Sequence, residues 1–226
     1  MSMQLWAGRA LALVGVLAAL TARAQAEEQS EVGVGVGGFF DVRTESKIGP
    51  SDTTFTYSGA RLAARGEKWG EAYVDLGWET LDLDRYDSGG GLAVGVGGTL
   101  WCWKWEAPVA PLALGIAGDY RTAEHSMEAA GDSEQTDVRH TSVSVQAVIQ
   151  ARLGSLSPYL RAGCLQSRLE PDAAGFFGDS GTRDTVPAIQ GGFEYEFNDQ
   201  VDRFTIGVEA SYFSGPGATV RLAYWF

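Results

Sequence analysis

Two side chains near the middle of the sequence have the spacing of an activated nucleophile. His140 stands two positions before Ser142. A histidine that takes the proton of a serine hydroxyl makes that oxygen a nucleophile, provided that a carboxylate orients the imidazole. Both residues lie at even positions of a segment whose odd positions are apolar, so we predict that both point away from its apolar side. A match of three residues is weak by itself, and we predict a polar wall without catalytic residues.

Two other motifs invite a chemical interpretation. Asp82 and Asp84 have the spacing of paired carboxylates that activate water, but neither His125 nor His140 follows an aspartate by two positions, as an assisting histidine would. Residues 33–38 match the G-x-G-x-x-G fingerprint of dinucleotide-binding folds. That fingerprint must open a helix, whereas here it continues as a strand pattern. We therefore predict no cofactor.

The metal-ligating residue types are scarce and scattered. The chain has two histidines, His125 and His140, and two cysteines, Cys102 and Cys164, with no spacing that resembles a zinc site. The cysteines fall in strand segments that are far apart in the predicted order, so we expect two small apolar side chains and no disulfide. We predict no metal site.

The elements that position these residues are strands, because apolar residues recur at every second position. Each stretch is near the roughly ten residues that a tilted strand needs to cross a membrane, and short connections alternate with longer ones rich in Gly, Asp, Ser and Thr. We predict an all-β, antiparallel, up-and-down transmembrane β-barrel of ten strands, or of eight if weakly alternating stretches merge. The predicted strands are 32–43, 54–65, 71–83, 91–102, 111–123, 138–153, 158–169, 185–197, 202–213 and 218–226.

The polar face of these strands carries charges and glycines, whereas the other face carries Val, Leu, Ile and aromatic residues. In a membrane barrel the apolar face contacts lipid and the charges lie in the lumen. Because antiparallel partners have residue numbers of constant sum, we predict Arg61 opposite Asp75 and Glu209 opposite Arg221. The predicted lumen charge network comprises Arg61, Asp75, Glu79, Arg152, Arg161, Glu194, Glu196, Glu209 and Arg221.

Aromatic residues should gather at the two membrane interfaces. One predicted girdle comprises Trp69, Trp101, Trp103, Trp105, Phe197, Phe204, Tyr224 and Phe226, at the end of the barrel that carries the chain termini. The other comprises Phe39, Phe40, Phe55, Tyr57, Tyr120, Tyr212 and Phe213, at the opposite end.

Residues 1–26 have the parts of a secretory signal peptide. Arg9 precedes an apolar stretch from Leu11 to Leu20, and an A-x-A site ends at Ala26. We predict cleavage there and a single barrel domain over 27–226. Removal of two arginines would leave 15 basic against 29 acidic residues, a charge of −14, which argues against a nucleic-acid partner.

The segment Ala218–Phe226 alternates as a strand and ends on an aromatic residue. This ending resembles the closing strand of bacterial outer-membrane β-barrels, such as small OmpA- or OmpW-like porin-type barrels. The resemblance implies that Tyr224 and Phe226 form a signal for the membrane-insertion machinery. It also implies Sec-type export and a location in the outer membrane, surrounded by lipid and lipopolysaccharide. We expect a monomer.

For function we predict a non-enzymatic barrel, either a structural or surface-interaction protein or a narrow pore. One alternative is a membrane-embedded hydrolase, because the His140–Ser142 spacing resembles that of lipid A deacylases and the Asp82–Asp84 pair resembles that of omptin proteases. Another alternative is a secreted soluble barrel that binds a ligand.

Overall fold

The protein is a barrel of ten strands. The computed structural model describes residues 32–45, 53–66, 69–83, 86–107, 110–128, 135–171, 182–199 and 202–226; the predicted signal peptide lies outside them. The strands are β1 (Val32–Glu45), β2 (Thr53–Gly66), β3 (Gly70–Leu83), β4 (Tyr86–Trp105), β5 (Leu112–Glu128), β6 (Gln135–Ala151), β7 (Leu156–Pro171), β8 (Thr182–Asp199), β9 (Asp202–Tyr212) and β10 (Pro216–Trp225). Across these described ranges, no helix is long and apolar enough to cross a membrane.

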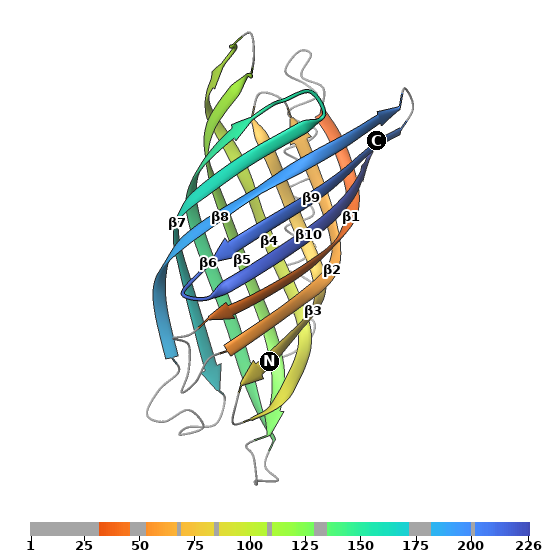
Figure 1. Cartoon of the computed structure of the whole chain (residues 1–226). Coiled ribbons are helices and arrows are strands. Elements are labelled where there is room, and N and C mark those ends of the chain that lie inside the picture. The colour runs from red at the N-terminus through yellow and green to blue at the C-terminus, as the bar shows by residue number, and fades with distance from the viewer. Residues whose placement is uncertain are drawn as a thin grey trace.

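The sheet closes on itself because β1 pairs with β10, from Gly35 opposite Trp225 to Arg43 opposite Gly217. All other neighbours in the sheet are consecutive antiparallel strands, as Figure 1 shows. Closure gives every strand a hydrogen-bonded neighbour on both sides, as a lipid environment requires. The ten-strand prediction is confirmed, and the eight-strand alternative is wrong. We call the end with Val32 and Trp225 the terminal end, at the top of Figure 1, and the opposite end the loop end.

Several strands are longer than the sequence pattern predicts. β5 and β6 extend toward the loop end and pair as far as Glu128 opposite Gln135. The predicted strand 91–102 ends before β4 does, because β4 continues to Trp105. A register shift between Trp101 and Trp103 interrupts the alternation, which explains why the pattern ends before the strand does.

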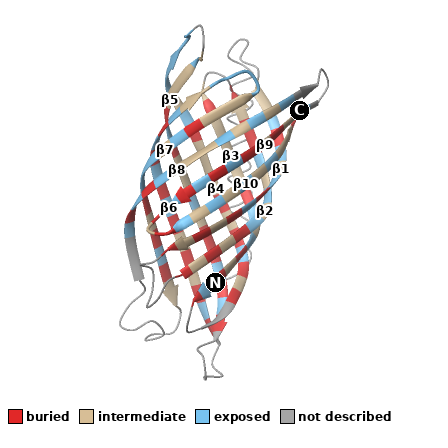
Figure 2. Ribbon diagram, viewed as in Figure 1, coloured by how far each residue is buried: buried red, intermediate tan, exposed pale blue. Residues whose placement is uncertain are grey.

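The outer surface of the barrel is apolar. Large hydrophobic side chains such as Leu76, Leu92, Val145 and Tyr212 are each more than half exposed. Figure 2 shows the consequence as alternating bands of buried and exposed residues along the strands. Charged side chains such as Asp75 take the inward positions. A soluble barrel would have the reverse arrangement, so that alternative is wrong.

Five aromatic residues of the two predicted girdles lie elsewhere, among them Trp101, which packs against buried residues of the lumen. Phe39, Phe55, Tyr57 and Phe213 are buried inside the barrel. Their positions share the inward parity of charged neighbours on their strands, such as Arg61 on β2. Outward aromatics of the same predicted set, including Phe40 and Tyr120, are exposed to the membrane side as expected.

Candidate functional site: the filled lumen

Near the terminal end, an arginine on β2 holds two carboxylates. The Nη2 atom of Arg65 lies 2.7 Å from Oε2 of Glu71 on β3 and 2.9 Å from Oε2 of Glu194 on β8. The guanidinium also lies 4.5 Å from the ring centroid of Trp225 on β10. One side chain thus ties together strands from both sides of the barrel closure.

The next charged pair is the one predicted from the constant sum of residue numbers in an antiparallel hairpin. Arg61 and Asp75 are register partners on β2 and β3, and two hydrogen bonds of 2.7 Å join the guanidinium to the two carboxylate oxygens. The Arg61 guanidinium also stacks over Tyr73, 3.5 Å from the ring centroid. Paired hydrogen bonds of this geometry are among the strongest between side chains.

Glu209 on β9 is a centre of hydrogen bonds in the middle of the lumen. Tyr159 donates to its Oε2 atom at 2.8 Å, and Gln190 donates to Oε1 at 3.0 Å. Arg221 lies 3.6 Å and Arg161 3.9 Å from Oε2. Three strands besides β9 therefore supply polar partners to one carboxylate.

The predicted register of Glu209 and Arg221 is wrong, although the two side chains do meet. The chain reverses at Ser214, with a φ of 79°, one residue before the turn centre that the sequence suggested. This places Arg221 opposite Gly207 and Glu209 opposite Thr219. The ion pair is diagonal, and Gly207 has no side chain to separate the two groups.

Asp41 on β1 organises the layer toward the loop end. It accepts hydrogen bonds from Arg121 at 3.1 Å and from Thr219 at 2.8 Å, and Arg43 lies 3.3 Å away. Arg121 also stacks over the ring of Tyr57 at 4.0 Å. Asp41 was absent from the predicted network, although its odd position on β1 matches the lumen parity.

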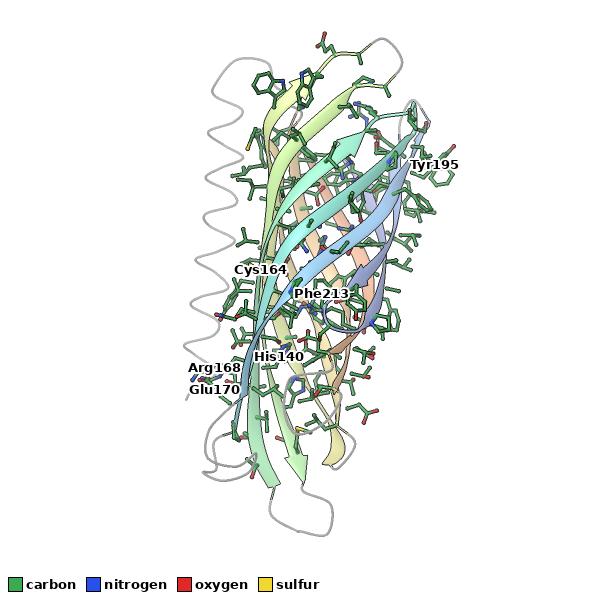
Figure 3. The ribbon with its side chains drawn as sticks, turned by 60° about the vertical axis from the view of Figure 1, so that its left-hand side comes forward. His140, Cys164, Arg168, Glu170, Tyr195 and Phe213 are labelled. Carbon is green, nitrogen blue, oxygen red and sulfur yellow. The ribbon has the colours of Figure 1, made fainter. Side chains whose placement is uncertain are left out.

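A buried polar cluster follows, formed by Glu79 on β3, His125 on β5 and His140 on β6. The Oε1 atom of Glu79 lies 2.6 Å from Nδ1 of His140 and 3.1 Å from Nε2 of His125. His140 also contacts Ser167 on β7, with 2.9 Å between Nε2 and Oγ. In Figure 3, His140 lies nearer the loop end than Phe213 does. The linear sequence gave no sign that these groups meet.

Apolar side chains fill the loop end of the lumen. Six buried residues from five strands pack together: Phe55, Leu81, Leu83, Met127, Val138 and Leu169. Phe55 stacks on the ring of His140 with 4.2 Å between centroids, so the apolar cluster covers the polar one. We call these six residues the apolar plug.

The cavity at the centre of the described lumen is small. A cavity of about 60 Å³ lies among Asp41, Arg61, Arg121, Glu209 and Arg221, enough for a few water molecules. The lumen from Arg65 to the apolar plug is therefore packed with charge pairs, aromatic rings and aliphatic side chains.

Some predicted site residues lie outside this network. Arg152 follows the end of β6 and is exposed, because the strand ends at Ala151. Glu196 has the inward parity and is half-buried near the terminal end. Asp82 is exposed on the outer side of β3, so it does not form a lumen pair, and Asp84 lies outside the described residues. The two cysteines are free, as expected.

The motifs first considered for catalysis occupy ordinary strand positions. His140 and Ser142 both point into the lumen and are buried, as the parity predicted. They do not form the nucleophile pair that the spacing suggested, since the hydroxyl at His140 belongs to Ser167. Residues 33–38 are part of β1, so the nucleotide fingerprint is a chance match.

The closed sheet and the apolar outer surface define the class of the molecule, an integral membrane β-barrel protein. The chain belongs to the outer membrane protein beta-barrel domain family, whose model matches residues 53–222. The protein is therefore located in the cell outer membrane. No curated protein matches the chain.

Solved structures with similar folds are also outer-membrane barrels. The translocator domain of the autotransporter NalP from Neisseria meningitidis is 11% identical, with a TM-score of 0.52, and the alignment covers 100% of this chain and 99% of that one. The attachment invasion locus protein Ail of Yersinia pestis, in complex with a heparin analogue, is 16% identical, with a TM-score of 0.42. That alignment covers 88% and 99% of the two chains. At 11% identity the likeness to the NalP domain concerns the fold alone.

Proposed function

We propose that this protein is a closed, non-conducting and non-enzymatic barrel with a structural or surface-interaction role. The observation that carries the proposal is the filled lumen, in which side chains from all ten strands meet. An open pore needs a continuous water-filled path, whereas the charges here are held in fixed pairs such as Arg61 with Asp75. The apolar plug covers the loop end of these pairs.

The packing also favours this role over that of a narrow pore. Ten strands lie between small barrels that side chains can fill and wider ones that enclose a channel. In this chain, aromatic residues on inward positions add volume that short polar side chains would not supply. Phe39 and Tyr57 pack together with 4.5 Å between their ring centroids.

The hydrolase alternative has one geometric argument in its favour. Ser167, His140 and Glu79 are arranged like a serine, histidine and acid of a nucleophilic triad. However, all three are at most 1% exposed, and Phe55 covers the imidazole. A lipid or peptide substrate has no access to this hydroxyl, so we assign the three residues no catalytic role.

We propose lipid and lipopolysaccharide as the surroundings of the outer surface and the insertion machinery as an assembly partner. Tyr224 and Phe226 suit such a signal because both point outward near the terminal end, with ring centroids 4.9 Å apart. Phe226 is 75% exposed.

An efflux assay tests this proposal. Vesicles that hold a small fluorescent solute would be reconstituted with the folded barrel, and a general porin would serve as positive control. We expect the leakage rate of protein-free vesicles, and porin-like leakage would refute the closed state. In parallel, lipid A incubated with the protein should keep its acyl chains; deacylation that is lost in Ser167→Ala would establish the hydrolase instead.

A further inference from the structure

Both histidines of this chain contact one atom. The sequence contains two histidines, on different strands, and the Nε2 atom of His125 and the Nδ1 atom of His140 lie 3.1 Å and 2.6 Å from Oε1 of Glu79. The three side chains are at most 1% exposed. One carboxylate oxygen can accept two N–H donors, and a metal ion brings the same groups together as ligands.

The ligand types identify the class of ion. Two imidazole nitrogens and one carboxylate oxygen suit zinc and neighbouring divalent transition metals, whereas calcium and magnesium prefer oxygen atoms alone. The three candidate ligand atoms all lie within 4.8 Å of one another. Around a tetrahedral zinc, atoms about 2.0–2.2 Å from the metal are separated by roughly 3.3–3.5 Å. Small side-chain rotations would therefore convert the present contacts into a coordination shell.

The surroundings also fit a bound cation. Ser167 contacts the second nitrogen of His140, which is the kind of outer hydrogen bond that orients a metal-bound imidazole. Two atoms of the cluster, Nδ1 of His125 and Oε2 of Glu79, are buried with no hydrogen-bond partner among the described residues. Arg121 approaches Oε2 at 3.6 Å, which leaves Oε1 as the oxygen that faces both histidines.

The nearby charges leave room for a dication. Arg121 on β5 lies 3.6 Å from Oε2 of Glu79. Glu45 on β1 is 1% exposed and faces both His140 and Glu79, so it adds a second buried carboxylate near the candidate ligand atoms. Arg43 lies 4.0 Å from Glu45 on the same strand.

One backbone feature lets the cluster form. Gly91 on β4 lies between β3 and β5, and a Cβ atom there would overlap the carbonyl oxygen of Glu124 on β5. Gly91 is the register partner of Glu79, so the position at which the cluster crosses β4 has no room for a side chain.

We propose that Glu79, His125 and His140 bind one divalent transition-metal ion, with zinc preferred, as an internal cross-link between β3, β5 and β6. The ion would fix the loop-end third of the barrel beneath the apolar plug. A site this buried cannot exchange ions rapidly, so it would be loaded as the barrel folds. Three protein ligands leave a fourth position for a water molecule. The role is nevertheless structural, because the three side chains are at most 1% exposed and no substrate reaches the ion.

Metal analysis of refolded protein tests the inference. Tag-free protein would be refolded into detergent micelles with zinc, passed over a desalting column with chelator, and analysed for zinc per folded chain. We expect close to one zinc per chain, and far less when zinc is added only after folding. Refolding with cobalt should give the visible absorption of a low-symmetry site with nitrogen ligands. Retention should fall when the refolding buffer is made acidic, because metal ligands must be unprotonated.

Conservative variants separate metal binding from hydrogen bonding. His125→Gln and His140→Asn each place an amide N–H near the position of the nitrogen that faces Glu79, so they keep a donor and remove a metal ligand. We expect each to fold, as judged by heat-modifiable migration, and to retain less than a tenth of the zinc. Glu124→Gln, which changes an exposed carboxylate of β5, is the matched control and should retain it all.

Three results would overturn the proposal. The first is wild-type protein that folds with zinc but retains well below one ion per chain. The second is zinc retention by the two histidine variants equal to that of the wild-type protein. The third is a loss of zinc in the Glu124→Gln control as large as that in the histidine variants. If a histidine variant fails to fold, the cobalt spectrum of the wild-type protein still decides, because binding at surface carboxylates alone would give the spectrum of an all-oxygen site.

Discussion

The Arg61–Asp75 pair should behave as one energetic unit. We consider Arg61→Met, Asp75→Leu and the double variant, which replace the charged groups with apolar ones of similar size. The exposed fractions of the two side chains are 14% and 4%, so each single variant leaves a charge in the lumen without its main partner. Breaking a buried pair in this way costs about 3–5 kcal/mol.

The two single variants should differ in a defined direction. Arg61→Met loses the paired hydrogen bonds and also the contact with the ring of Tyr73, worth about 0.5–2 kcal/mol. It should therefore be more destabilising than Asp75→Leu. The double variant leaves no unpaired charge, so its loss should fall below the sum of the single losses by at least about 2 kcal/mol.

The assay is reversible urea unfolding in detergent or thin vesicles, followed by tryptophan fluorescence and by heat-modifiable migration. Arg139 and Glu124 provide the control, because their N–O distance is 3.0 Å but their exposed fractions are 37% and 48%. Their coupling energy should be about 0–1 kcal/mol. Additive losses at Arg61 and Asp75, or a coupling no larger than that of the exposed pair, would refute the desolvated network.

Other variants and labels test the fold. Cys164 faces outward at the middle of β7, so in vesicles a lipid-soluble maleimide should label it while a membrane-impermeant one should not; rapid labelling by both would contradict its position in the bilayer. Gly91→Ala should destabilise the barrel because its Cβ meets the backbone of β5, whereas Gly38→Ala, with its nearest contact at 3.5 Å, should be tolerated; equal urea midpoints would contradict this. Leu169→Ala should cost about 2–5 kcal/mol because the side chain is fully buried in the apolar plug, and a loss below 1 kcal/mol in urea unfolding would show that the plug is loose.

The sequence predicts the barrel well because one physical rule acts along its whole length. A lipid-facing side must be apolar, so alternation marks each strand and its inward residues. The pairing of Arg61 with Asp75 follows from a hairpin whose turn position could be estimated from the strands on each side. The predicted partner of Arg221, Glu209, was wrong because a shift of the turn by one residue moves every partner by two positions.

The contents of the lumen were harder to predict. Phe55 and Tyr57 carry the inward parity of β2, although their aromatic type alone predicts a place at the membrane interface. The cluster of Glu79, His125 and His140 joins strands β3, β5 and β6 across Gly91. Such contacts depend on barrel curvature and side-chain reach, which spacing along one chain does not record.

Single-channel recording in a planar bilayer tests the central claim most directly. Folded protein, with insertion verified by heat-modifiable migration of the same preparation, should give no stable conductance steps in symmetrical potassium chloride, because charge pairs and the apolar plug fill the lumen. A plug-opened variant, Phe55→Ala with Leu169→Ala, should remain silent or flicker briefly, because the charge layers are still in place. Long-lived, uniform conductance steps from the wild-type protein would contradict the closed barrel.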